Sequence, residues 1–497
     1  MLKCTIIYIV NKRRFVSITR ILTIKKMIKF GTGGWRSLIG SDFIESNVKI
    51  VAESIYRLAV EQNKLDKPIA IGYDNRFLSD EAAEWIVEVL TAHGIVVWLV
   101  NQPVPTPLIM HMVKKHNLYY GIEVTASHNP YIYNGVKLFV DEGRDAPINI
   151  TERVEFLANT LQHETITSMP LDKAVAYGLV NILKNPLSEF VDDILNIVDV
   201  NAIKRSGLRV IIDPMYGSGY YPLNMILNSA RCIVDSIHNN HDAYFGSLPP
   251  APDPLTIKEL RSKVVDGNYN LGIALDGDGD RLGIIDSNGQ YINANEILCM
   301  LYWYLHKYKN WDGPVVRNLA TTHMLDKIAK SFNETCYEVP VGFKHISSAL
   351  SKYDAILGGE SSGGLTVRGH IYGKDSIFAA SLFVEMICVT GLTASEILDG
   401  LQKEFGVFEM VECNLHITNE QMTNVRELIL KFNSISLNNK KIVKTTTFDG
   451  LKLNFEDDSW ILIRPSGTEP VLRIFAEAKT ADIAQSYIDS LRTRFRI

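Results

Sequence analysis

The sequence predicts an α/β protein with three similar domains on mixed sheets, followed by a smaller C-terminal α+β domain. The chain has 497 residues, which exceeds one ordinary domain. Strand-like and helix-like segments alternate between residues 68 and 332, a pattern typical of βαβ units. The last block, beyond about residue 405, differs because strand-like segments lead into one final helix at residues 481–495.

The first predicted domain covers residues 27–185. Strands are expected at residues 68–73, 95–100 and 119–124, where β-branched and other apolar residues cluster. Between the first two strands, Ser79 followed by acidic residues predicts a capped helix start.

The same alternation recurs in two further predicted domains, at residues 186–294 and 295–403. Each contains a strand followed by a helix, namely 208–213 with 217–230, and 314–319 with 321–332. Residues 404–497 form the fourth predicted domain. No repeat of individual residues relates the blocks, so their similarity rests on the pattern of elements alone.

Residues 123–130 read Glu-Val-Thr-Ala-Ser-His-Asn-Pro and follow a largely apolar run. The change to small and polar residues predicts a strand that ends in a tight loop, with Ser127 at an exposed tip beside His128. An unhindered hydroxyl with polar neighbours is a candidate nucleophile or phosphate carrier. Ordinary turn chemistry is the alternative for this serine loop, residues 125–130, taken alone.

Asp276, Asp278 and Asp280 alternate with glycines between two apolar strand-like segments, and Arg281 follows. Glycine permits backbone angles that let three carboxylates converge, and oxygen ligands suit Mg²⁺. An acidic hairpin turn is one alternative for this metal loop, residues 276–281. An EF-hand is another, but its bidentate Glu is missing because Ser287 occupies the twelfth position.

Two further loops carry residues that suit a phosphorylated sugar. In the sugar loop, residues 360–364, Glu360 and Ser362 are two apart and face the same side of an extended segment. In the phosphate loop, residues 464–468, Arg464 offers a forked donor, and Ser466, Gly467 and Thr468 can complete an anion nest. A flexible glycine turn and a plain Pro-Gly hairpin are the respective alternatives.

These loops, with residues 30–36 and 133–137, resemble the α-D-phosphohexomutase superfamily, the phosphoglucomutase and phosphomannomutase family. The resemblance runs from Phe30 to the C-terminus and implies four domains around a central cleft. It implies catalytic roles for Ser127, His128, Lys137, Arg36 and Arg281. It implies substrate binding by Gly342, Lys344, Glu360, Ser362, Arg464, Ser466, Gly467 and Thr468. It implies a Mg²⁺ site formed by Ser127, Asp276, Asp278 and Asp280.

The resemblance implies a phosphoglucomutase that interconverts α-D-glucose 1-phosphate and glucose 6-phosphate through a phosphoserine and glucose 1,6-bisphosphate, which also acts as activator. Gly342-Phe343-Lys344 is similar to members that act on glucose, and the sugar loop lacks the Gly-His ending of other branches. The alternatives are a phosphomannomutase, a bifunctional phosphohexomutase or a mutase for glucosamine phosphates. A non-catalytic phosphosugar-binding protein is a further alternative on the same fold.

Composition restricts the partners. A net charge of −5 gives no general attraction to nucleic acid or to an anionic membrane, and no apolar run has the ~18–20 residues needed to cross a bilayer. Six scattered cysteines without a C-x-x-C pair indicate free thiols in a reducing compartment, so we expect a cytoplasmic enzyme that is a monomer or a dimer.

Residues 1–26 form a basic N-terminal extension with seven lysines and arginines and no acidic residue. We interpret this segment as an artificial or upstream extension, with Met27 at the true start. A transit peptide is the alternative.

Overall fold

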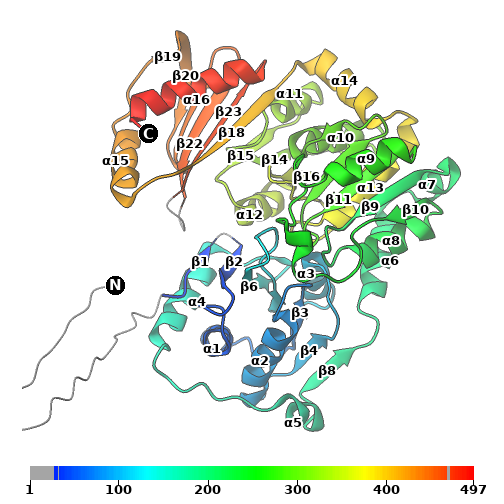
Figure 1. Ribbon diagram of the computed structural model, residues 1–497, viewed down its shortest axis with the longest axis vertical. Helices are drawn as coiled ribbons and strands as arrows, with labels where there is room; N and C mark the ends of the chain where they lie inside the picture. Colours follow the sequence, from blue (N-terminus) through cyan, green and yellow to red (C-terminus); the bar gives the residue numbers. More distant parts are fainter. Residues whose placement is uncertain (1–26, 32, 467–470) are drawn as a thin grey trace, which may run out of the picture.

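The computed structural model describes residues 27–31, 33–466 and 471–497. Four sheets follow one another along the chain, and Figure 1 shows the fourth with its helices as a separate lobe beside the third. The extension at residues 1–26 lies outside the described residues. The predicted fold class is confirmed, with three α/β domains and a smaller C-terminal domain.

The first domain has an eight-stranded mixed sheet in the order β1-β2-β6-β5-β3-β4-β8, with β7 paired to β6. Its strands are β1 (Phe30–Gly31), β2 (Gly34–Leu38), β3 (Ile69–Tyr73), β4 (Val97–Val100), β5 (Gly121–Val124), β6 (Tyr133–Val140), β7 (Arg144–Asp145) and β8 (Val180–Leu183). Its helices are α1 (Glu45–Glu61), α2 (Ser79–Ala92), α3 (Thr106–Lys115), α4 (Ile148–Thr160) and α5 (Leu171–Ala176).

The second domain has a five-stranded sheet in the order β10-β9-β11-β12-β13. Its strands are β9 (Arg209–Asp213), β10 (Ile233–Ser236), β11 (Leu271–Leu275), β12 (Leu282–Asp286) and β13 (Tyr291–Ile292). Its helices are α6 (Leu187–Ile197), α7 (Val200–Ser206), α8 (Tyr220–Ser229) and α9 (Lys258–Asp266), with a short 3₁₀ turn at Phe245–Ser247.

The third domain has a four-stranded sheet in the order β15-β14-β16-β17. Its strands are β14 (Val315–Asn318), β15 (Cys336–Val339), β16 (Leu357–Gly359) and β17 (Leu365–Val367). Its helices are α10 (Ala294–Lys307), α11 (Met324–Ser331), α12 (Phe343–Tyr353), α13 (Ser376–Thr390) and α14 (Ala394–Phe405).

One four-stranded unit recurs in these three sheets. The orders β4-β3-β5-β6, β10-β9-β11-β12 and β15-β14-β16-β17 are equivalent, with three parallel strands and a fourth antiparallel strand at one side. The serine, metal and sugar loops each connect the third and fourth strands of their unit. Topology therefore places the three loops at the same position of three similar sheets.

The fourth domain is an antiparallel six-stranded sheet in the order β18-β23-β22-β21-β20-β19, and the phosphate loop begins at Arg464, in the last two residues of β22. Its strands are β18 (Glu409–His416), β19 (Ser436–Leu437), β20 (Lys440–Thr446), β21 (Leu451–Phe455), β22 (Trp460–Pro465) and β23 (Val471–Ala478). Helix α15 (Asn419–Leu430) and helix α16 (Ala481–Phe495) pack on it.

Buried polar contacts attach the fourth domain to the third. The Lys452 ammonium lies 2.6 Å from a Glu338 carboxylate oxygen that also accepts a bond from Arg317 at 2.8 Å. The Glu477 carboxylate of the fourth domain accepts the His323 backbone N–H of the third domain at 2.9 Å. Burial and the nearby Arg317 charge together lower the pKa of Lys452 to about 8. Separating Lys452 from Glu338 would leave buried charges unpaired, which costs free energy. The contact therefore restrains the lobe that carries the phosphate loop.

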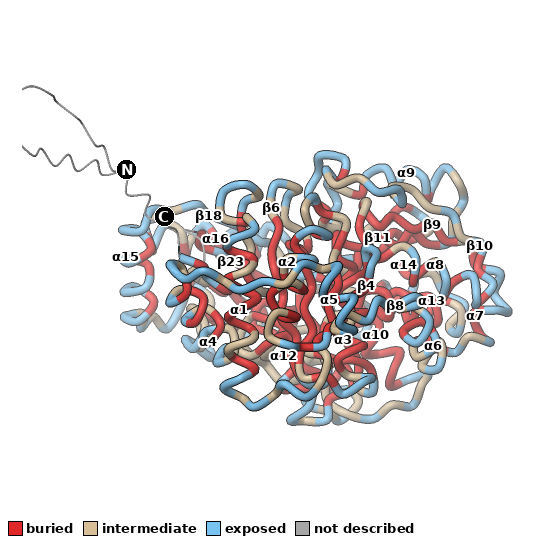
Figure 2. The backbone as a smooth tube through the Cα atoms, turned by 90° about the horizontal axis from the view of Figure 1, so that it is seen from below, coloured by how far each residue is buried: buried red, intermediate tan, exposed pale blue. Residues whose placement is uncertain are grey.

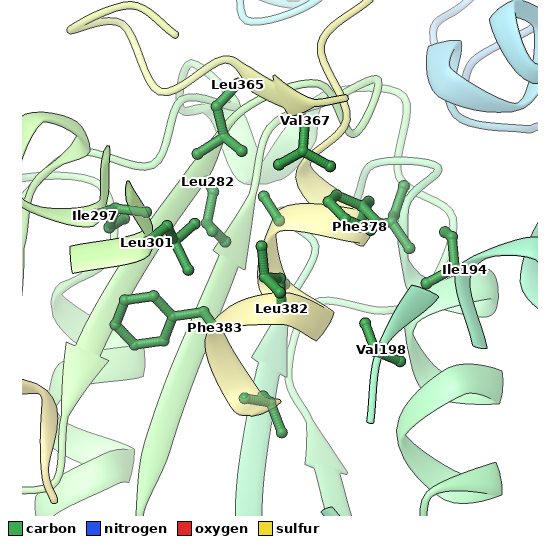
Figure 3. Packing of buried hydrophobic residues seen from close by; sticks show 14 of the residues in the cluster. Ile194, Val198, Leu282, Ile297, Leu301, Leu365, Val367, Phe378, Leu382 and Phe383 are labelled. Carbon is green, nitrogen blue, oxygen red and sulfur yellow. The ribbon is translucent and has the colours of Figure 1, made fainter. Parts of the chain in front are cut away.

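Helix α13 joins the second and third domains. It is apolar nearly all round and buried from Ser376 to Ile387, as expected for a helix enclosed on every side. Figure 3 shows Phe378 and Leu382 of this helix packed among Leu282, Val367 and Ile194, which come from both domains. Strands such as β6 and β11 are likewise buried along their length in Figure 2. This shared core fixes the metal loop relative to the sugar loop.

The predicted cap of α2 is wrong. Leu78, in the left-handed region with φ +64°, precedes this helix, and no side chain caps it. The Ser79 hydroxyl donates instead to Asp74 at 2.8 Å, below the serine loop. Tertiary contact therefore replaces the local cap.

Among the described residues, no single helix has the length and apolar character to cross a bilayer, although the bent pair α13 and α14 passes that test when taken together.

Candidate active site

The Ser127 side chain is fully buried, which corrects the expectation of an exposed loop tip. A left-handed backbone with φ +52° turns the residue inward. Its hydroxyl donates to an Asp276 carboxylate oxygen at 2.9 Å and lies 3.5 Å from His128 Nδ1. A non-glycine residue held in this region at a functional loop is a strained position that the surroundings must maintain.

The burial of Ser127 comes from the second domain. A Cβ added at Gly277 would lie 2.8 Å from the Ser127 carbonyl oxygen and 3.1 Å from Pro250. Only glycine lets the metal loop approach the serine loop this closely, and Gly279 adopts φ +67°, which favours glycine as well. Two loops about 150 residues apart in sequence are thus held in direct contact.

The structure brings Asp276, Asp278 and Asp280 together, with one carboxylate oxygen from each within 4.8 Å of the others. All three are fully buried. One oxygen of Asp278 and one of Asp280 have no hydrogen-bond partner among the described residues. A buried cluster of three carboxylates, two of which have an oxygen without a donor, fits a hard divalent cation.

Two lysines compensate this negative charge. Lys137 on β6 contacts Asp278 at 2.5 Å and Asp280 at 2.8 Å, and Lys374 contacts Asp280 at 2.8 Å. Burial alone would lower the pKa of Lys137, but the two carboxylates outweigh it and raise the pKa. Burial opposes ionisation of Asp280, yet Lys137, Lys374 and Arg281 hold its pKa well below the ordinary value. Lys137 is therefore a fixed positive charge beside the acidic triad.

Asp276 differs from its two neighbours. Burial, with the charges of Asp280 and Asp278, raises its pKa well above the ordinary range. Its Oδ1 accepts the Asp280 and Arg281 backbone N–H groups at 2.8 and 3.0 Å. The loop backbone thus orients this carboxylate toward Ser127.

The remaining predicted catalytic residues belong to the serine and metal loops or contact them. Arg36 donates to the Asn129 side chain at 2.7 Å, and Arg281 Nε lies 3.8 Å from Asp280. Burial and the charges of Arg281 and Arg36 lower the pKa of His128 well below its usual value. The site thus holds several fixed cations, an arrangement that attracts a dianionic phosphoryl group.

In the sugar loop, Glu360 is fixed by two donors on one oxygen. Asn318 Nδ2 and the Gly342 backbone N–H both donate to its Oε1 at 2.9 Å. The Ser362 hydroxyl lies 3.5 Å from its Oε2, but a turn closed by the Gly363 N–H on the Glu360 carbonyl at 3.1 Å brings them together, and the predicted extended segment is absent from these residues. This carboxylate thus keeps an oriented oxygen for a ligand hydroxyl.

Lys344 and Arg464 bring two cations to a second pole. The Arg464 guanidinium donates to Asp449 at 2.8 Å, and Asp449 also accepts the Val341 N–H of the third domain at 2.8 Å. Burial lowers the pKa of Lys344, and the nearby Arg464 charge lowers it further. Ser466 follows Arg464 at the end of β22. Gly467 and Thr468 lie outside the described residues.

Sequence reasoning missed several supporting residues, of which Arg76 makes the most contacts. It is buried and donates to the backbone carbonyls of Ser127, Asn129, Pro130 and Tyr133 at 2.5 to 3.0 Å. Its Nε lies 3.2 Å from Asp74. The signal was present in the sequence, because Asp74 and Arg76 directly follow a predicted strand, where the carboxyl ends of parallel strands collect functional groups.

Domain models for phosphoglucomutase/phosphomannomutase match four stretches of the chain. The alpha/beta/alpha domains I, II and III match residues 27–164, 188–289 and 293–405, and the C-terminal domain matches residues 422–494.

Relatives match along nearly the whole chain. A phosphoglucomutase/phosphomannomutase of Thermococcus kodakarensis is 28% identical, over 93% of this chain and 96% of that protein. A phosphoglucosamine/phosphogalactosamine mutase of Sulfurisphaera tokodaii is also 28% identical, over 93% and 98%. A crystal structure from Thermus thermophilus, provisionally described as a phosphomannomutase, superposes with a TM-score of 0.82 at 25% identity, over 95% and 100%.

Proposed function

Because the chain belongs to the phosphoglucomutase/phosphomannomutase family and is a phosphohexomutase, we propose that it interconverts α-D-glucose 1-phosphate and glucose 6-phosphate. The observation that carries this proposal is the 2.9 Å contact between the Ser127 hydroxyl and Asp276 inside the buried acidic triad. It joins a phosphate carrier to a cation site, and fixed cations surround both.

Ser127 carries the phosphoryl group in the resting enzyme. In the forward direction the 6-hydroxyl oxygen of glucose 1-phosphate bonds to phosphorus while the bond from phosphorus to Ser127 Oγ breaks. The hydroxyl proton ends on Ser127 Oγ, which leaves glucose 1,6-bisphosphate and free Ser127. After the bisphosphate turns end over end, its 1-phosphoryl group returns to Ser127 by the reverse exchange.

Asp276, Asp278 and Asp280, with an oxygen of a phosphorylated Ser127, would hold a Mg²⁺ ion. When bound, the ion would neutralise charge on the phosphoryl group in transfer. Lys137 supports that charge as a fixed ammonium, and Arg36, His128 and Arg281 surround the group. Glucose 1,6-bisphosphate is the activator, because it phosphorylates a free Ser127.

The sugar and phosphate loops recognise the rest of the substrate. Glu360 and Ser362 accept hydrogen bonds from hydroxyl groups of the sugar ring. Lys344, Arg464 and Ser466 hold the phosphate that is not reacting. Both phosphates of the bisphosphate intermediate must fit this second pole in turn. Recognition at this pole therefore depends on charge and hydrogen bonds to the phosphate, which are the same for either end of the sugar.

A substrate comparison tests the sugar assignment. We expect kcat/KM to be highest for glucose 1-phosphate when glucose, mannose and glucosamine 1-phosphates are compared, each with its matching bisphosphate. The Gly342-Phe343-Lys344 segment and the absence of a Gly-His ending motivate the order. A higher kcat/KM for the mannose or glucosamine phosphate would assign the enzyme to that branch of the family. Relatives described as a phosphoglucomutase/phosphomannomutase and as a phosphoglucosamine/phosphogalactosamine mutase make both results worth testing.

Loss of Arg464 should weaken recognition of the distal phosphate. Charge-assisted bonds from arginine are worth roughly 1.5–3 kcal/mol, so Arg464→Ala should lower kcat/KM for glucose 1-phosphate by about ten- to a hundredfold. Arg473, its exposed cross-strand partner on β23, gives a matched control. Equal kinetics for Arg464→Ala, Arg473→Ala and the unsubstituted enzyme would remove the fourth domain from the site.

A further inference from the structure

In each of the three domains, an Asp or Asn lies at the end of the strand that comes first in the sequence of the repeated unit. These strands are β3, β9 and β14, and Asp74 directly follows β3. Asp74, Asp213 and Asn318 each accept the backbone N–H two residues ahead, at 3.0, 2.8 and 2.8 Å. The same side chain thus closes the same turn three times, although the sequence shows no residue repeat around it.

In the first domain this position supports the serine loop. Asp74 Oδ2 accepts the Thr125 hydroxyl at 2.6 Å, and the Thr125 oxygen accepts the Ser127 backbone N–H at 2.8 Å. All three residues are buried. The chain of bonds fixes the peptide that enters the left-handed Ser127, and therefore fixes the direction of its hydroxyl.

In the third domain the equivalent position supports the sugar loop. Asn318 Nδ2 donates to Glu360 Oε1 at 2.9 Å, while its own oxygen holds the turn. Thr125 and Glu360 are equivalent, since each is the first residue after the third strand of its unit. The residue types follow their partners: Asp74 meets a hydroxyl donor, whereas Asn318 meets a carboxylate and must donate.

In the second domain, Asp213 closes the same turn but does not bond to the metal loop. Asp213 pairs with Ala274, two residues before Asp276. In the other two domains, the residues just before Asp74 and Asn318 already pair with the last residues of the third strand, as Tyr73 with Val124 and Arg317 with Gly359. Asp213 accepts bonds from Met215 and His238. This two-residue offset keeps a like charge away from Asp276.

We propose that Asp74 and Asn318 are equivalent positioning residues that act on separate steps: Asp74, through Thr125, on phosphoryl transfer at Ser127, and Asn318, through Glu360, on recognition of the sugar. The inference rests on the proposed function for the assignment of the two steps. Neither residue contacts the reacting atoms.

Thr125 tests the first arm without removing a buried charge. Thr125→Val keeps the shape but lacks the hydroxyl, and we expect kcat to fall about ten- to a hundredfold while KM stays within about threefold. Thr125→Ser restores the hydroxyl and should return kcat to within a few-fold. A general packing defect would not distinguish serine from valine in this way, and thermal unfolding of both variants checks the fold.

Asn318→Asp tests the second arm, because it sets a carboxylate against Glu360. We expect KM for glucose 1-phosphate to rise about tenfold or more and the ratio of kcat/KM for glucose to mannose phosphates to change, with the phosphoserine content unaltered by intact mass. Asp213→Asn is the matched control, since this position reaches none of the loops. Its kinetic constants should stay within about threefold of those of the unsubstituted enzyme.

The proposal is overturned if Thr125→Ser does not rescue Thr125→Val, if Asn318→Asp leaves KM and the sugar ratio unchanged, or if both arms change the same constant. These outcomes differ from failure of the proposed function, in which the unsubstituted enzyme converts no hexose phosphate. In that case the role of Thr125 can still be tested by measuring the phosphoserine content by intact mass. Equal phosphoserine content in Thr125→Val and Thr125→Ser would overturn the role proposed for Thr125.

Discussion

Ser127→Ala should abolish mutase activity and remove one phosphoryl group from the intact mass of the protein. Its hydroxyl donates to Asp276 of the acidic triad at 2.9 Å, and Lys137 and Lys374 contact the other two carboxylates of that triad. Removing a nucleophile that passes through a covalent intermediate costs on the order of 10⁴-fold or more in kcat. Residual turnover should therefore fall below detection in a coupled assay at saturating glucose 1-phosphate and glucose 1,6-bisphosphate.

The control for this substitution is Ser361→Ala. Ser361 lies in the sugar loop, but its side chain lines a separate cavity of about 340 Å³ with Asn295 and Gln402. It should retain both the phosphoryl group and kcat within about twofold, as for most substitutions away from a site. A phosphoryl group that persists in Ser127→Ala would show that another residue is the carrier.

Spacing along the chain predicted the parts of the site that are local. Asp276, Asp278 and Asp280 converge because they share one six-residue loop between two strands, as their alternation with glycine indicated. Glu360 and Ser362 face each other for the same reason. In each case a short loop leaves few conformations, so the residue pattern nearly determines the geometry.

Contacts between distant segments could not be predicted in this way. The burial of Ser127 depends on Asp276 and Gly277 from another domain, and Lys374 reaches Asp280 from beyond the sugar loop. Ser79 reads locally as a helix cap but bonds to Asp74 instead. A single sequence records the propensities of a segment but not its tertiary partners, and the partners decide such cases.

The equivalence of the three units was also hidden, for a related reason. The turn at the end of the first strand needs only one side-chain oxygen, which Asp74, Asp213 and Asn318 supply in different local sequences. The flanking residues meet different partners and have diverged in type. The repeat is therefore preserved in hydrogen bonding and topology rather than in sequence.

Asp278→Asn should weaken cation binding and slow phosphoryl transfer together. The variant replaces a buried carboxylate whose Oδ1 has no donor among the described residues and whose Oδ2 is held by Lys137 and Thr106. Because the bound ion stabilises charge in the group being transferred, kcat should fall about a hundredfold or more.

Thermal unfolding gives a readout of the same substitution that is independent of activity. A ligand present at 100 times its Kd stabilises the folded state by about 2.7 kcal/mol, so added Mg²⁺ should raise the melting temperature of the unsubstituted protein. In Asp278→Asn that increase should largely disappear, whereas Asp312→Asn, at an exposed side chain, should keep it. An equal Mg²⁺-dependent increase in the melting temperature of both variants, or full activity in EDTA, would show that the triad does not hold the ion. The negative charge of its three buried carboxylates would then need compensation from another source besides Lys137 and Lys374.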